Sequence, residues 1–247
     1  MPSLHAGPVV GLGVQVVLLA VLTATTGLGA GGWVVGIAYG AITCAVLTHG
    51  LRRAGSDDLG PADRVTLTRA VLAGGVGALT VDSFDRAVPV AVLVTLTIVA
   101  LVLDGVDGQV ARRTGTVSAL GARFDMEVDS FLLAVLSVYA AHTFGGWVLA
   151  IGGMRYAFVL AIWVLPWMRG SLPRRYWRKV VAATQGVVLV FGTADVLPRR
   201  LMVAALVVSL VLLVESFGRD VRYLWQHRSA QLTGLRLPLS GTAHDPG

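Results

Sequence analysis

Long apolar runs, separated by short polar segments, make up most of this chain. The runs cover approximately residues 8–29, 33–49, 65–81, 87–103, 130–144, 147–168, 180–194 and 201–216. With a few flanking polar residues added, each reaches the roughly 20 residues with which a helix crosses a bilayer. The runs lack the alternation typical of barrel strands, and backbone groups in hydrocarbon must bond within the chain. The pattern predicts an all-α integral membrane protein, a polytopic bundle of eight transmembrane helices.

The composition supports lipid as the solvent of this chain. Hydrophobic residues make up 55% and charged residues 14% of the 247 residues, and the mean hydropathy is +0.74. The formal net charge of +6 comes from arginines in short segments between the apolar runs, where anionic lipid headgroups are better partners than nucleic acid. The single cysteine, Cys44, excludes an intrachain disulfide and a cysteine-based metal cluster. We therefore expect membrane lipids as partners and no nucleic acid.

The basic residues predict the orientation in the membrane. If both termini lie inside, only Arg86, Arg199 and Arg200 lie on the outer side of the membrane, and the positive-inside bias favours this arrangement. The basic residues on the inner side are then Arg52, Arg53, Arg64, Arg112, Arg113, Arg123, Arg169, Arg174, Arg175, Arg178, Lys179, Arg219, Arg222, Arg228 and Arg236. The segment before the first run has no Lys or Arg, which favours a retained helix over a cleaved signal peptide. Richness in Ala, Val, Leu and Arg favours a prokaryotic plasma membrane.

Four aspartates stand between the fourth and fifth apolar runs, on the predicted cytoplasmic side. They are Asp104, Asp107, Asp125 and Asp129. On helices the first two share a face at i,i+3 and the last two at i,i+4, so an antiparallel hairpin would aim all four carboxylates at one point. Converging negative charges beside a bilayer require cations or protons. Hard oxygen ligands select Mg²⁺ or Mn²⁺, and four carboxylates suit two such ions, which can bridge a diphosphate in phosphoryl-type transfer.

Residues next to the aspartates fit the same chemistry. Gly108 and Gly121 remove side chains where a nucleotide or a facing helix must come close. Arg112 follows Asp104 by eight residues, where a guanidinium can fork onto a phosphate oxygen. Asp129, at the end of the row, is a candidate both for binding a metal and for taking the proton of an attacking hydroxyl.

The pattern DxxDGxxAR, then eight residues, then GxxxDxxxD resembles the signature of the CDP-alcohol phosphatidyltransferase family. Its defined positions are filled by Asp104, Asp107, Gly108, Ala111, Arg112, Gly121, Asp125 and Asp129. The resemblance implies that the first three aspartates bind metal and that the fourth binds metal and acts as the base. The residues implied to frame the CDP group are Gly108, Ala111, Arg112 and Gly121. The implied reaction transfers a phosphatidyl group from a CDP-alcohol, such as CDP-diacylglycerol, to an acceptor hydroxyl and releases CMP, in phospholipid biosynthesis.

The resemblance also implies a division of the chain. The family core has six helices, which would correspond here to residues 56–228. Residues 1–55 then form two additional N-terminal transmembrane helices. Residues 229–247 are polar and rich in Gly and Pro, which predicts a disordered tail. The family resemblance further implies a homodimer.

Two shorter segments resemble the family outside its signature. PADRVTLTRA is similar to the opening of the first core helix and implies nucleotide binding by Thr66 and Arg69, with Asp63 where Asn is common. RKVVAATQ is similar to a family Lys-x-Lys-Thr-x-x-Gln stretch at Lys179 and Gln185.

The candidates for binding the acceptor are Arg155, Arg175 and Lys179. Arg155 lies in an apolar run, where snorkelling or a structural carboxylate partner is as good an explanation as an acceptor phosphate. Glu215 and Asp220 are expected to pair with nearby arginines. The acceptor stays open among glycerol 3-phosphate, inositol or its phosphate, another polar alcohol and a lipid hydroxyl.

Three other functions also involve acidic residues in a membrane protein. A divalent-cation transporter also places carboxylates in the membrane, but it has no need of the adjacent Gly, Ala and Arg. An intramembrane prenyltransferase uses acidic motifs on two widely separated loops, whereas here all four aspartates belong to one hairpin. A catalytically inactive scaffold is disfavoured because the acidic pattern is complete.

Overall fold

The chain folds into a helical bundle, described in a computed structural model for residues 6–55, 59–114, 118–169 and 176–227. Its helices are α1 Ala6–Thr26, α2 Ala30–Ala54, α3 Pro61–Asp82, α4 Val90–Thr114, α5 Ala119–Phe144, α6 Leu149–Val164, α7 Tyr176–Ala194 and α8 Arg199–Gln226. Two 3₁₀ turns, Gly146–Val148 and Pro166–Arg169, flank α6. These described ranges contain no strand. The predicted fold class, with its eight helices, is confirmed; the predicted tail at 229–247 lies outside the described residues.

Several of these helices have the length and composition to cross a membrane. They are α1, α2, α3, α6 with the turn before it, and α8. Helices α4 and α7 carry shorter apolar stretches, Val90–Val106 and Val180–Ala194. The chain is therefore a multi-pass membrane protein.

The six tryptophans of the sequence mark the two ends of the bundle. Trp33 and Trp147 lie where α2 and α6 begin, at one end. Trp163, Trp167, Trp177 and Trp225 lie where α6 and α8 end and α7 begins, at the other end. Tryptophan is enriched at the two membrane–water interfaces, because its ring is apolar and its N–H needs a polar partner. The positions fit helices that run from one interface to the other.

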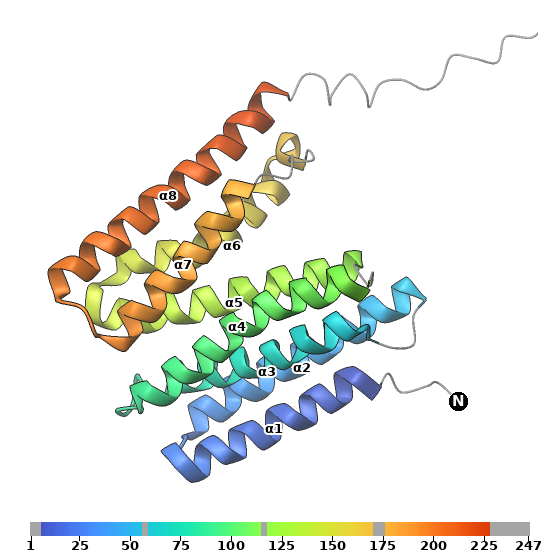
Figure 1. The fold of residues 1–247 in the computed structure, drawn as a ribbon, viewed down its shortest axis with the longest axis vertical. Helices are drawn as coiled ribbons and strands as arrows, with labels where there is room; N and C mark the ends of the chain where they lie inside the picture. The colour runs from blue at the N-terminus through green and yellow to red at the C-terminus, as the bar shows by residue number, and fades with distance from the viewer. Residues whose placement is uncertain (1–5, 56–58, 115–117, 170–175, 228–247) are drawn as a thin grey trace, which may run out of the picture.

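Helix α3 forms the centre of the bundle. It packs against α1, α2, α4 and α5, and most of its residues are buried. Figure 1 shows α1 to α5 stacked side by side, with α6, α7 and α8 beyond α5. Small residues allow such close packing. At Gly32, for example, a Cβ would lie 2.9 Å from the backbone oxygen of Ala78 on α3.

The two N-terminal helices are fastened to α3 by one buried carboxylate. Asp82 Oδ1 accepts a hydrogen bond of 3.0 Å from the backbone N–H of Gly29, between α1 and α2. Asp82 Oδ2 lies 3.2 Å from Arg86 Nε, and Arg86 Nη1 donates to the Gly27 carbonyl at 2.5 Å. Asp82 is 3% exposed, whereas the Arg86 side chain is 47% exposed, so the carboxylate is buried while its arginine partner reaches the surface. The α1–α2 hairpin is thus part of the same packed bundle.

Candidate metal and nucleotide site

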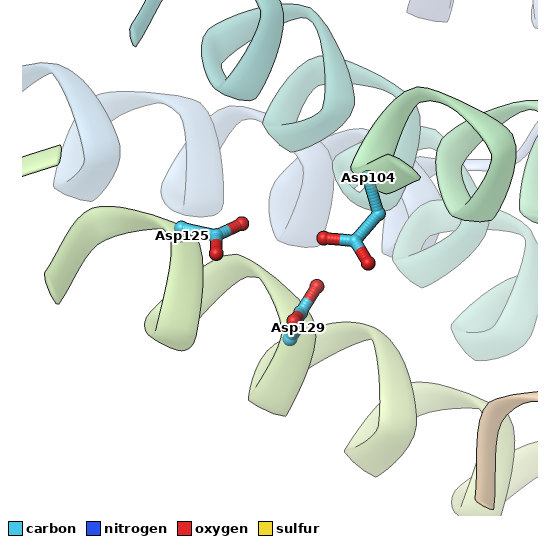
Figure 2. Close-up of side chains that lie close together, drawn as sticks. All are labelled: Asp104, Asp125 and Asp129. Atoms are coloured by element: carbon cyan, nitrogen blue, oxygen red, sulfur yellow. The ribbon is translucent and has the colours of Figure 1, made fainter. Parts of the chain in front are cut away.

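Three of the four motif aspartates converge between α4 and α5. Asp104 comes from α4, and Asp125 and Asp129 come from consecutive turns of α5. One ligand oxygen from each lies within 4.8 Å of the other two. Figure 2 shows the three carboxylates directed toward one another across the space between the helices. The predicted convergence is confirmed for these three residues.

The start of α5 positions its two aspartates. Ser118 is the N-cap, and its Oγ accepts a hydrogen bond of 2.8 Å from the backbone N–H of Gly121. Such a cap satisfies one of the free N–H groups of a first helical turn. The helix therefore begins before the acidic residues, and Asp125 and Asp129 follow on one face at i,i+4 spacing.

The fourth aspartate lies on α4, one turn beyond Asp104. The backbone of Asp107 is helical, but its side chain lies outside the described residues. The surroundings of Gly108 and the side chains of Ala111 and Arg112 also lie outside what the structure describes. Their predicted roles in binding metal and nucleotide stay predictions.

A buried arginine on α3 joins the acidic cluster. Arg69 is 0% exposed, and its Nη2 lies 2.9 Å from Asp104 Oδ1. Nη1 also pairs with Asp125, and Nη2 with Asp129. The guanidinium Nε donates to the backbone carbonyl of Ala100 on α4 at 3.2 Å. Arg69 therefore ties three helices together, while its predicted nucleotide contact stays a prediction.

The carboxylates are open to one side and incompletely neutralised by Arg69. The side chains of Asp104, Asp125 and Asp129 are 43%, 37% and 40% exposed. Three carboxylates against one guanidinium leave excess negative charge beside an apolar interior, which favours binding of a further cation. The donors are all carboxylate oxygens, the ligands that Mg²⁺ and Mn²⁺ prefer. The described residues thus fit a hard divalent cation.

Thr66 and Gly121 lie close to this cluster. Thr66 is 3% exposed on α3, one turn before Arg69, and its hydroxyl donates to the Ala62 carbonyl at 3.2 Å. At Gly121, a Cβ would overlap the carboxylate of Asp63 on the first turn of α3. Of the two explanations offered for this glycine, close approach of a facing helix is the one observed. Nucleotide binding by Thr66 and Gly121 stays a prediction.

Arg155 lies on another side of α5 from the acidic cluster. Its Nη2 is 2.5 Å from Glu127 Oε1. Glu127 is two residues from each of Asp125 and Asp129, which is roughly 200° around a helix of 3.6 residues per turn. The structural carboxylate partner foreseen as an alternative is therefore present, and acceptor binding by Arg155 stays a prediction.

The other two acceptor candidates are not described. Arg175 lies outside the described residues, and so does the side chain of Lys179 on α7. Gln185, matched to the same family stretch, is buried between α7 and α8. Its Nε2 donates to the Ser209 carbonyl at 2.9 Å, and Ser209 Oγ donates to Gln185 Oε1 at 2.5 Å. Gln185 thus fastens α7 to α8.

Two pairings on α8 were expected from the sequence. Glu215 pairs with Arg219 one turn later, and Asp220 Oδ2 lies 3.5 Å from Arg178 Nη1 on α7. The sequence did not reveal Glu127, nor the carboxylate partners of Arg69. The only available signal was general: an arginine inside a transmembrane helix requires a nearby negative charge.

Comparison with known families identifies the core of this bundle. A family model described as CDP-alcohol phosphatidyltransferase matches residues 59–214, more than half of the chain. The match begins just before α3, ends within α8, and contains Arg69 and the acidic cluster. Comparison with curated proteins and with solved structures gave no match. The chain belongs to the CDP-alcohol phosphatidyltransferase family, which makes it a membrane-embedded transferase of the CDP-alcohol type.

Proposed function

We propose that this protein transfers a phosphatidyl group from a CDP-alcohol, such as CDP-diacylglycerol, to an acceptor hydroxyl in phospholipid biosynthesis. The main support is the convergence of three motif carboxylates from α4 and α5 within a chain of this family. The acceptor oxygen attacks the phosphorus that carries the lipid. The bond from that phosphorus to the bridging oxygen breaks, and CMP leaves.

The proposed cofactors are two Mg²⁺ or Mn²⁺ ions. Their ligands would be Asp104, Asp107, Asp125 and Asp129. Bound divalent ions polarise the phosphorus under attack and neutralise charge on the leaving phosphate. Oxygen-only ligands and an exposed side of the cluster support this choice.

The remaining chemistry belongs to the residues of the chain. Asp129 accepts the proton of the attacking hydroxyl, which raises the nucleophilicity of the acceptor oxygen. The CDP group is held by Thr66, Arg69, Gly108, Ala111, Arg112 and Gly121. The acceptor is held by Arg175 and Lys179, whereas Arg155, the third candidate, lies on another side of α5, where it pairs with Glu127. These roles follow from the family resemblance.

The test is product identification with purified protein. Detergent-solubilised protein is incubated with CDP-diacylglycerol, Mg²⁺ or Mn²⁺ and a pool of hydroxyl acceptors, and the products are identified by mass spectrometry. We expect CMP and one new phosphodiester lipid from the wild type, no turnover from Asp125→Asn, and wild-type turnover from Asp85→Asn, an exposed aspartate beyond α3. Full activity of Asp129→Ala would reject the assignment of the base. Nucleotide-independent Mn²⁺ flux into proteoliposomes, without product, would support a transporter instead.

We also propose that the protein lies in a prokaryotic plasma membrane with the acidic cluster facing the cytoplasm. The excess of Arg at the end of the bundle that holds the cluster supports this orientation. In a Cys44→Ala background, a membrane-impermeant maleimide should label Asp85→Cys in intact cells but label Arg53→Cys only after lysis. The opposite labelling pattern would refute the proposed orientation.

A homodimer is the proposed assembly. Arg155 lies midway along the candidate span Gly146–Val164, and Glu127 pairs with it. Their side chains are 30% and 60% exposed, which is unfavourable against lipid tails. Arg155 Nε is buried and has no acceptor among the described residues. A second copy related by a two-fold axis would present Glu127 to Arg155 and Arg155 to Glu127.

A further inference from the structure

Arg69 is a buried arginine that contacts the acidic cluster through ion pairs and hydrogen bonds. It belongs to α3, outside the acidic signature, yet its guanidinium contacts Asp104, Asp125 and Asp129 together. Its Nε is engaged by the Ala100 carbonyl. A fully buried guanidinium held this way is a fixed positive charge inside the acidic cluster, because arginine does not lose its proton in proteins.

We propose that Arg69 is a positioning residue that sets the charge of the metal site: it opposes metal binding in the absence of nucleotide and favours a doubly charged diphosphate once metal is bound. This inference rests on the proposed function. It extends that function by naming what makes the site select a diphosphate diester.

Opposition to metal follows from shared ligand atoms. Oδ1 of Asp104, Asp125 and Asp129 all face Arg69. A divalent cation drawn to the cluster meets carboxylates that already interact with a guanidinium, and it is repelled by the positive charge of that group. Replacing Arg69 by a neutral residue of similar length should therefore strengthen metal binding when no nucleotide is present.

Preference for a diphosphate follows from the net charge. With the four motif aspartates ionised and two divalent ions bound, the cluster would be neutral without Arg69 and carries one positive charge with it. A CDP-alcohol brings two negative charges on its diphosphate. Because Arg69 is fully buried beside the cluster, its charge is incompletely screened by water and should change nucleotide affinity appreciably.

The test compares Arg69→Gln with Arg69→Lys. Binding of Mn²⁺ alone is measured by electron paramagnetic resonance, and binding of CDP-glycerol is measured by calorimetry in saturating Mn²⁺. For Arg69→Gln we expect Mn²⁺ affinity to rise by about tenfold or more and CDP-glycerol affinity to fall by a similar factor, since one unit charge is removed from among the carboxylates of the cluster. Arg69→Lys keeps the charge and should stay near the wild type in both assays. Arg86→Gln, at the outer end of α3, is the control without effect.

Both effects proposed for Arg69, the opposition to metal and the preference for a diphosphate, can be refuted separately. Unchanged or weaker Mn²⁺ binding in folded Arg69→Gln overturns the opposition to metal, and unchanged CDP-glycerol affinity overturns the diphosphate preference. If Arg69→Gln does not fold, the proposal is tested with the wild type and Arg69→Lys. In both proteins CDP-glycerol must then strengthen Mn²⁺ binding. Mn²⁺ affinity independent of CDP-glycerol would refute the proposal. The Mn²⁺ arm needs no turnover, so expected Mn²⁺ results without any phosphodiester product would count against the proposed function alone.

Discussion

Gly121 at the start of α5 lies directly against Asp63 on the first turn of α3, so closely that a Cβ on Gly121 would overlap the Asp63 carboxylate. Asp63 is held in place by the backbone N–H of Gly60, which donates to Oδ2 at 3.3 Å. The contact lets α5 approach α3. That approach is what brings Arg69 on α3 within reach of Asp125 and Asp129 on α5.

Gly121→Ala should therefore destabilise the protein and lower its activity. Added volume at a tight helix contact typically costs about 1–3 kcal/mol, which exceeds the roughly 1 kcal/mol that alanine gains over glycine inside a helix. The free energy of unfolding can be followed by thermal melting in detergent. The matched control is Gly218→Ala on α8, where a Cβ would meet no atom within 4 Å, and which should melt at or above the wild-type temperature. Equal behaviour of the two variants would contradict the packing role of Gly121.

Divalent metal should stabilise the folded protein. Mn²⁺ or Mg²⁺ binds the converged carboxylates of the native state and not the dispersed ones of the unfolded chain, so a concentration of about 100 times the dissociation constant adds roughly 2.7 kcal/mol. We expect the melting temperature to rise with Mn²⁺ in the wild type and in Asp85→Asn. The rise should vanish in Asp104→Asn and in Asp125→Asn. A metal-dependent shift that survives both substitutions would place the metal elsewhere.

The sequence predicted the helices better than it predicted their ends. The apolar run 87–103 ends directly before Asp104 and the run 130–144 begins directly after Asp129, so both leave out the acidic motif. In the structure α4 continues through the motif to Thr114, and α5 begins at Ala119. An apolar run ends where the chain stops contacting lipid. A helix can continue into polar residues beyond that point, because its end depends on the hydrogen bonds of the backbone. The spacing of the aspartates was the better guide, because i,i+3 and i,i+4 patterns have meaning only on helices.

Partners from distant helices were beyond the reach of the sequence. The convergence of Asp104 with Asp125 and Asp129 could be predicted, since one short hairpin carries all three. The insertion of Arg69 among them depends on the rotation of α3 against α4 and α5, which small residues on all sides permit but do not specify. The pairing of Arg155 with Glu127 likewise depends on which side of α5 faces α6.

The α1–α2 hairpin should loosen from the bundle when its buried carboxylate is removed. Asp82→Ala deletes the acceptor for the Gly29 N–H and the partner of Arg86. Leaving a fully buried donor unsatisfied costs about 1–3 kcal/mol, and because the Gly29 N–H is partly buried, the loss should lie toward the lower end of that range. Thermal melting of the full chain should therefore show a clear drop in stability. The control is Asp85→Ala, at an exposed position one turn further on, which should shift the free energy of unfolding by less than about 0.5 kcal/mol. A loss of stability in Asp85→Ala as large as that in Asp82→Ala would show that the contacts of Asp82 do not hold the α1–α2 hairpin.

Dimerisation through Glu127 and Arg155 makes a prediction about mixtures. E127R places a second positive charge beside Arg155 on the face where the copies would meet, and R155E places two negative charges there, so neither variant should pair with itself. Mixed together in vesicles, the two variants should pair with each other, because each positive residue of one subunit meets a negative residue of the other. Energy transfer between differently labelled variants measures this, with labelled wild type as the reference. Equal transfer in E127R alone, in R155E alone and in the mixture would show that copies do not meet at this face. Transfer in none of the three samples would also contradict the prediction, provided that thermal melting shows both variants folded.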